Sequence, residues 1–221
     1  MDFNTGSGGS GGSGGSSRGS GGPSRVSGGA SGGEFNYSDP VQSFITTVRN
    51  VVTAPVGFFR GIRREGDFVN PLIFAIICYE VSAILGGLLS LVGVTGSRGF
   101  GSFLVSIILA PIFAAIGLFI GAGIIHLLVM LIVGSRNSGF EGTFRVSAYS
   151  SVTSLVSWIP VIGWIASLYG IYLAIMGIRE VHNTSTGKAA IVVLIPAVVV
   201  ILLALIIIAA IGAAIFFGTQ Q

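Results

Sequence analysis

Long apolar runs separated by short polar stretches occupy the chain from residue 71 onward. Crossing the hydrocarbon core of a bilayer takes ~20 helical residues, so runs of this kind indicate transmembrane helices. Only one charged residue, Glu80, interrupts the first run, and the second and last runs carry none. The pattern predicts an all-α, polytopic membrane bundle of five transmembrane helices, over about 71–94, 103–133, 144–158, 161–178 and 189–217.

The third and fourth predicted spans are separated only by Ile159 and Pro160. The third is also short and rich in serine, so the alternative is a bent, re-entrant pair that does not cross. Trp158 and Trp164 flank the turn, and tryptophan is enriched at membrane interfaces. This favours two crossings.

Before the first span, residues 38–66 have an amphipathic pattern. Apolar side chains at helical spacing form one stripe that starts at Val41, with Asp39 and Pro40 suited to the N-cap and first turn. Pro55 ends this helix, and Arg60, Arg63 and Arg64 then alternate with apolar residues, as expected of anchors at an anionic membrane surface. The alternative is an ordinary helix that caps the bundle.

Residues 1–37 form a Gly/Ser-rich tail, with 14 Gly and 9 Ser between positions 5 and 33. Such a composition cannot bury enough apolar surface to become ordered, so we expect a disordered segment. Its start lacks the basic and apolar regions of a cleaved secretory signal. An engineered linker is the alternative interpretation.

Composition supports a membrane protein: 52% of residues are hydrophobic and 9% are charged, against roughly 25% charged in soluble domains. The formal net charge of +3 arises from residues scattered between apolar runs, so nucleic-acid binding is not expected. The single cysteine, Cys78, excludes an intramolecular disulfide.

The basic residues predict the orientation. With a cytoplasmic N-terminus and five spans, eight basic residues lie inside and only Arg98 lies outside, as the positive-inside rule requires. The C-terminus is then outside. The eight are Arg49, Arg60, Arg63, Arg64, Arg136, Arg145, Arg179 and Lys188.

Four loose motifs occur in order on these spans: residues 142–150, 158–163, 177–182 and 185–189. Together with residues 53–59 and 70–72, they resemble the Yip1 domain family over about residues 47–217. The resemblance implies a five-span membrane protein with a cytoplasmic N-terminus, and its eukaryotic members are linked to Rab GTPases and vesicle traffic. The Gly/Ser tail matches no cytosolic segment of those members, so we expect a prokaryotic-type member in a cell membrane.

Ionisable groups inside a membrane are costly unless they are paired or hydrated. Glu80 and His126 fall at similar depths of the first two spans, and Arg145 and Tyr149 enter the third from the same side. We therefore predict a polar cluster of these four residues, either functional or only holding the helices together.

Two further sets of residues are candidate sites. Gly163, Gly170 and Gly177 recur every seven residues and allow close backbone approach, within the chain or in a homo-oligomer. A cytoplasmic contact surface, or simply a solvated end, is predicted at Arg179, Glu180, His182 and Lys188.

The spacing of His, Cys, Ser and acidic residues indicates no metal site, no cofactor and no catalytic centre. We therefore expect a non-enzymatic scaffold or interaction protein in membrane organisation or trafficking, with lipids and an unidentified membrane or cytoplasmic protein as partners. The alternative is a small transporter or channel component that uses the polar third span and Glu80.

Overall fold

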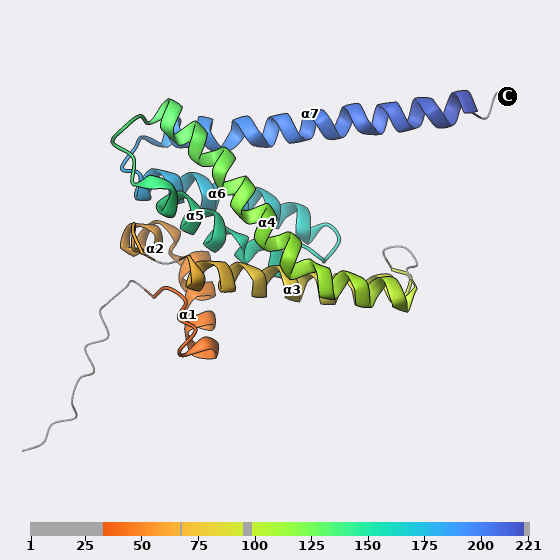
Figure 1. Ribbon diagram of the computed structural model, residues 1–221, viewed down its shortest axis with the longest axis horizontal. Helices are drawn as coiled ribbons and strands as arrows, with labels where there is room; N and C mark the ends of the chain where they lie inside the picture. Colours follow the sequence, from red (N-terminus) through yellow and green to blue (C-terminus); the bar gives the residue numbers. More distant parts are fainter. Residues whose placement is uncertain (1–32, 67, 95–98, 219–221) are drawn as a thin grey trace, which may run out of the picture. The chain divides into compact units, whose positions relative to one another are not determined.

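The computed structural model describes residues 33–66, 68–94 and 99–218, with side chains as far as residue 213. This part of the chain is helical and contains no strand (Figure 1). The predicted disordered tail falls mainly on residues 1–32, which lie outside the described residues. The helices are α1 (Pro40–Thr53), α2 (Pro55–Gly61), α3 (Val69–Leu91), α4 (Phe100–Ile132), α5 (Gly139–Ser150), the 3₁₀ helix η1 (Ser151–Val156), α6 (Ile162–Val181) and α7 (Thr186–Gly218).

Four of these helices, α3, α4, α6 and α7, are long and apolar enough to cross a membrane. They correspond to the first, second, fourth and fifth predicted spans. Most of their apolar side chains are exposed on the surface of the protein. A helix that is hydrophobic on all sides is stable where lipid surrounds it, so this surface faces the membrane. The chain is therefore a multi-pass integral membrane protein.

The third predicted span, 144–158, differs from the other four. It falls on α5 and η1, which have 12 and 6 residues, and neither is by itself long enough for a membrane-spanning helix. The α-helix ends where the serines gather: the hydroxyls of Ser151, Thr153 and Ser154 each donate to the carbonyl three residues earlier. Such local bonds compete with the α-helical ladder and tighten the chain to 3₁₀ geometry.

The three regularly spaced glycines of α6 all face the α5–η1 segment. A Cβ added at Gly177 would lie 2.5 Å from Val146 Cγ1, and one at Gly170 would lie 3.0 Å from Thr153 Oγ1. A Cβ at Gly163 would overlap the backbone carbonyl of Ser157. The structure thus uses these glycines for close packing within the chain.

The amphipathic segment both caps the bundle and presents apolar side chains outward. In α1, Thr47 and Val51 are buried and Phe44 packs against the core, whereas Val41 and Ile45 are 71% and 56% exposed. In α2, Phe58 and Phe59 are buried, and the helix packs against α6. We call residues 33–66 the cap.

Candidate functional site

The ends of several helices meet at one end of the bundle, which we call the basic end. Ser138, before α5, binds the residues that close α6: its hydroxyl donates to the Val181 carbonyl and its backbone N–H to His182 Nδ1. Arg179 of α6 in turn donates to Thr186 at the start of α7. The cap packs on this end, so charged side chains from distant parts of the sequence come together here.

The centre of the basic end is Glu34, which joins the cap to α5. Its Oε2 accepts a 2.6 Å hydrogen bond from Arg145 Nη1 and a 3.0 Å bond from the Tyr149 hydroxyl, and its Oε1 accepts from the backbone N–H of Arg63 at 2.7 Å. The Glu34 and Arg145 side chains are only 6% and 4% exposed. This is a buried ion pair, of the kind in which loss of one partner is far more costly than loss of both.

Local structure aligns these partners. Arg145 and Tyr149 are one helical turn apart, so they project from the same face of α5. Phe35, which is buried, follows Glu34 and packs 6.1 Å from the ring of Phe74 in α3. This aromatic contact holds Phe35 against α3 and thereby positions the carboxylate of the neighbouring Glu34.

Glu34 is the functional-site residue that sequence reasoning missed. It lies at the end of a Gly/Ser run, where no helical or strand-like spacing of apolar residues indicates an ordered segment. The available signal was Glu34 together with Phe35, the first acidic and large apolar pair after the Gly/Ser run of residues 5–33, in a chain where a buried arginine needs a carboxylate.

The four residues of the predicted polar cluster fall into separate contacts. Arg145 and Tyr149 meet on Glu34, and His126 Nδ1 lies 2.9 Å from Thr143 Oγ1. No described hydrogen bond joins Glu80 to the other three, and its Oε2 is buried without a hydrogen-bond partner among the described residues.

Two histidines share one hydroxyl. Thr143 Oγ1 lies 3.0 Å from His182 Nε2, and the two imidazole rings are 6.5 Å apart between centroids. Because the Ser138 N–H donates to His182 Nδ1, a neutral His182 carries its proton on Nε2 and donates it to Thr143. The Thr143 hydroxyl can then donate to His126 Nδ1, 2.9 Å away, in preference to the more distant Gly139 carbonyl at 3.5 Å.

His182 is only 1% exposed, so the structure places it inside the basic end and not on the contact surface that the sequence suggested. Burial, with smaller contributions from His126 and Arg64, lowers the pKa of His182 to about 4 from an ordinary 6.5. The residue is therefore neutral near pH 7 and acts in packing.

This burial predicts an acid-dependent stability. Below pH 6.5 the unfolded chain takes up a proton at position 182 more readily than the folded one, so stability falls as the pH drops from 6.5 toward 4. We expect the thermal midpoint of the detergent-solubilised protein to fall in that interval, and His182→Gln to make the curve flatter there. Parallel pH curves for parent and variant would contradict this role of His182.

Three arginines form a network around Glu180, whose side chain is only 12% exposed. Its Oε2 accepts from Arg60 Nε at 2.9 Å, and its Oε1 accepts from Arg179 Nη2 at 2.5 Å. Arg64 Nη2 reaches Asn183 Oδ1 at 3.2 Å. Two of the predicted membrane anchors, Arg60 and Arg64, thus bind the α6–α7 junction, and Arg63 contributes its backbone N–H to Glu34.

Lys188 completes the exposed part of this end, near the start of α7. We call Arg60, Arg64, Arg179, Glu180 and Lys188 the basic-end surface. Within the described part of the chain, no group of three or more His, Cys, Asp or Glu side chains is placed to hold a metal ion.

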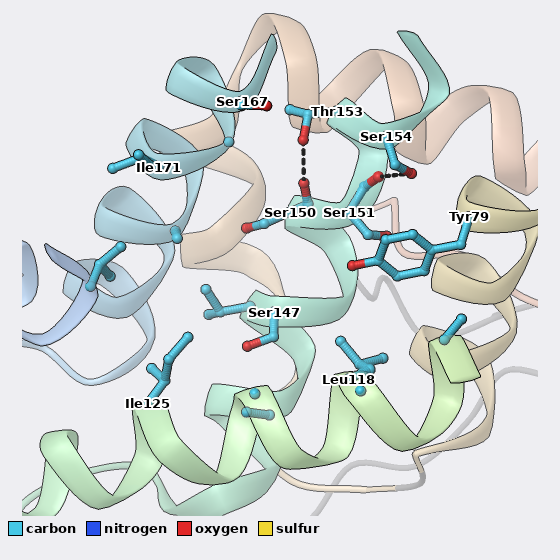
Figure 2. Close-up of a pocket in the computed structure, with 18 of the residues that line it drawn as sticks. Tyr79, Leu118, Ile125, Ser147, Ser150, Ser151, Thr153, Ser154, Ser167 and Ile171 are labelled. Carbon is cyan, nitrogen blue, oxygen red and sulfur yellow. Dashed lines mark hydrogen bonds between the residues drawn. The ribbon is translucent and has the colours of Figure 1, made fainter. Parts of the chain in front are cut away.

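A second feature lies deeper in the bundle, between α3, α4, α5–η1 and α6. It is a cavity of about 610 Å³, lined on one side by small and apolar residues of α4 and on the other by the serines and threonine of α5–η1 (Figure 2). Toward the basic end its lining is apolar, with Ile125, Val146, Ile178 and Val193. Glu80 is not among the lining residues.

Comparison with known proteins identifies the domain. The family model for the Yip1 domain matches residues 49–208, which include the end of α1, all of α2 to α6 and most of α7. Searches of curated proteins and of solved structures found no match. Since the match covers more than half of the chain, this protein belongs to the Yip1 domain family.

Proposed function

We propose that this protein is a non-enzymatic scaffold or interaction protein of membrane organisation or trafficking, which binds a partner through its basic-end surface. The observation that carries the proposal is the buried Glu34–Arg145 pair, because it joins the cap to α5 of the helix bundle. A fixed cap offers a partner a folded surface beside the membrane. The Yip1 family consists generally of non-enzymatic trafficking proteins, which supports the same role.

The basic-end surface suits a protein partner because its charged side chains are held in place by ion pairs and are still partly exposed. Glu180 fixes Arg60 and Arg179, yet the Arg60 side chain remains 69% exposed. Ordered charges of both signs favour specific recognition and correct register over strong nonspecific attraction. Membrane lipids or a second copy of the chain are the other partners we expect at this surface.

A transporter or channel component is the second candidate, favoured by the hydroxyl-lined cavity. Two features of the cavity weigh against it. The apolar residues toward the basic end would obstruct a polar solute there, and the carboxylate of Glu80 does not line the cavity. A cavity of this kind is better suited to binding than to passage.

Five crossings, with a cytoplasmic N-terminus and an external C-terminus, complete the proposal. The 12 residues of α5 and the 6 of η1 would together extend about 30 Å, the thickness of the hydrocarbon core. Ser157, after η1, lies 3.0 Å from Ser82 of α3 between hydroxyl oxygens, and Trp158 lies beside Gly86. Both contacts are with the half of α3 remote from the basic end, which supports a third crossing. Membership of the prokaryotic branch remains part of the proposal.

Cysteine labelling tests the topology. In a Cys78→Ala background, we expect an impermeant maleimide added to intact cells to label Val94→Cys and Val161→Cys, but not Ser135→Cys. Val94 and Val161 are 61% and 71% exposed, and Ser135 is also exposed. External labelling of Ser135→Cys would reverse the orientation. Labelling of Val94→Cys without Val161→Cys would favour the re-entrant alternative.

Crosslinking in native membranes tests the function. We expect a specific protein partner to be recovered with the parent chain and lost when Arg60→Glu and Lys188→Glu are combined. Arg49→Glu is the matched control, because Arg49 is exposed on α1 outside the basic-end surface. Solute transport in proteoliposomes that is abolished by Glu80→Gln, without a partner dependent on the basic-end surface, would favour the transporter instead.

A further inference from the structure

The hydroxyl side of the cavity is built for hydrogen bonding inside the membrane. Five hydroxyls on this side each donate a hydrogen bond to a backbone carbonyl of their own segment. They belong to Ser147, Ser151, Thr153, Ser154 and Ser167. Their oxygen lone pairs therefore remain available as acceptors. A ligand that binds there must supply hydrogen-bond donors.

One hydroxyl in the cavity wall has no such bond. Ser150 Oγ is buried and has no hydrogen-bond partner among the described residues. Figure 2 shows that the hydroxyls of Ser147, Ser150 and Tyr79 point toward the open space. A buried polar group without a partner is costly, so an occupant that hydrogen-bonds Ser150 would gain more than the usual energy of one bond.

The opposite wall is apolar and open. Gly117 and Gly121 of α4 line the cavity, and a Cβ added at either would meet nothing within 4 Å. Leu118, Ala122 and Ile125 extend this wall. Together the two walls form an amphipathic site, with hydrocarbon on the α4 side and hydroxyls on the α5–η1 side.

The charges around the cavity limit the class of ligand. Its lining contains no Asp, Glu, Lys, Arg or His among the described residues. A phosphate or ammonium headgroup would therefore enter a membrane interior without a counter-ion, at a large energetic cost. A neutral hydroxyl has no such cost, and it can donate to the serine oxygens while it accepts from Ser150.

We propose that this cavity is a binding site for an uncharged, hydroxyl-bearing lipid. The lipid hydroxyl would lie against α5–η1 near Ser150, and its hydrocarbon would lie along Gly117 and Gly121 of α4. The volume of about 610 Å³ falls within the usual range of ligand sites, roughly 300–1,000 Å³. Diacylglycerol, sterols and polyisoprenols share this chemistry. The site goes beyond the scaffold role and is independent of the basic-end surface.

Photolabelling of the full-length protein in nanodiscs tests this site. The probe is a diacylglycerol analogue with a diazirine on one acyl chain and an alkyne for detection. We expect adducts on peptides from α4 and α5–η1. Unlabelled diacylglycerol should halve the labelling at about one tenth of the concentration at which phosphatidic acid or phosphatidylcholine does so. Stronger competition by cholesterol or a polyisoprenol would support the site and identify a different natural source.

Matched variants on one helix separate a specific site from general lipid contact. Gly121→Leu fills the cavity and should reduce labelling about tenfold. Gly123→Leu is the control, because Gly123 also has open space around it but does not line the cavity. Ser150→Ala should reduce labelling about fivefold through loss of one hydrogen bond.

Four results would overturn the proposal. The first is equal competition by the charged lipids, and the second is equal labelling of Gly121→Leu and Gly123→Leu. The third is a dimer that Gly121→Leu alone dissociates while lipid labelling is unchanged, because the groove would then hold a second copy of the chain. Adducts that map only to α7 would contradict the location.

Discussion

Replacing Glu34 with glutamine should lower the free energy of unfolding by about 3 kcal/mol, because it removes the negative charge that Glu34 places against the buried Arg145 guanidinium. The Tyr149 hydroxyl and the Arg63 N–H bind the same carboxylate, so their bonds weaken as well. The cap should then open before the membrane helices do. Thermal unfolding in detergent, with hydrogen exchange of residues 33–62, measures both effects.

Two controls identify the ion pair as the cause. Glu65→Gln makes the same chemical change at an exposed position of the cap and should shift stability by less than about 0.5 kcal/mol. Combining Glu34→Gln with Arg145→Met removes both charges, and the double variant should be less destabilised than the sum of the single ones. Strict additivity, or an unchanged cap in Glu34→Gln, would show that the pair does not hold the cap.

Gly163→Ala should lower the stability of the bundle by about 1–3 kcal/mol, because the new methyl group overlaps the backbone carbonyl of Ser157. A backbone atom cannot rotate away as a side chain can, so the η1–α6 turn must shift. The turn is already constrained, since Val161 has a positive φ of 69°. Thermal unfolding measures the loss.

The matched control is Gly123→Ala on α4, where an added Cβ meets nothing within 4 Å. There the substitution relieves only the helix penalty of glycine, so stability should rise by up to about 1 kcal/mol. The two glycine-to-alanine changes should therefore have opposite signs. A Gly163→Ala variant as stable as Gly123→Ala would mean that α6 and η1 do not pack as described.

The membrane helices were largely readable from the sequence, because the bilayer imposes a length and a composition that few other structures satisfy. Pro40 and Pro55 likewise begin α1 and α2. Proline suits the first turn of a helix because the backbone N–H that it lacks would have no partner within the helix there. The seven-residue spacing of Gly163, Gly170 and Gly177 indicated close packing, and the structure supplies the partner segment, α5–η1.

Contacts between residues far apart in the sequence could not be predicted in the same way. Arg145 was expected near Glu80, but it forms an ion pair with Glu34, more than a hundred residues away in the chain. His182 resembled a surface residue because charged neighbours flank it, whereas contacts with Ser138 and Thr143 bury it. Both outcomes depend on tertiary packing, which local composition and spacing do not encode.

Alkaline extraction of native membranes shows whether lipid surrounds α3, α4, α6 and α7. The full-length chain should stay in the membrane pellet at high pH and become a monodisperse species only after detergent is added. Release into the supernatant as a monodisperse protein without detergent would mean that these four helices do not span a membrane.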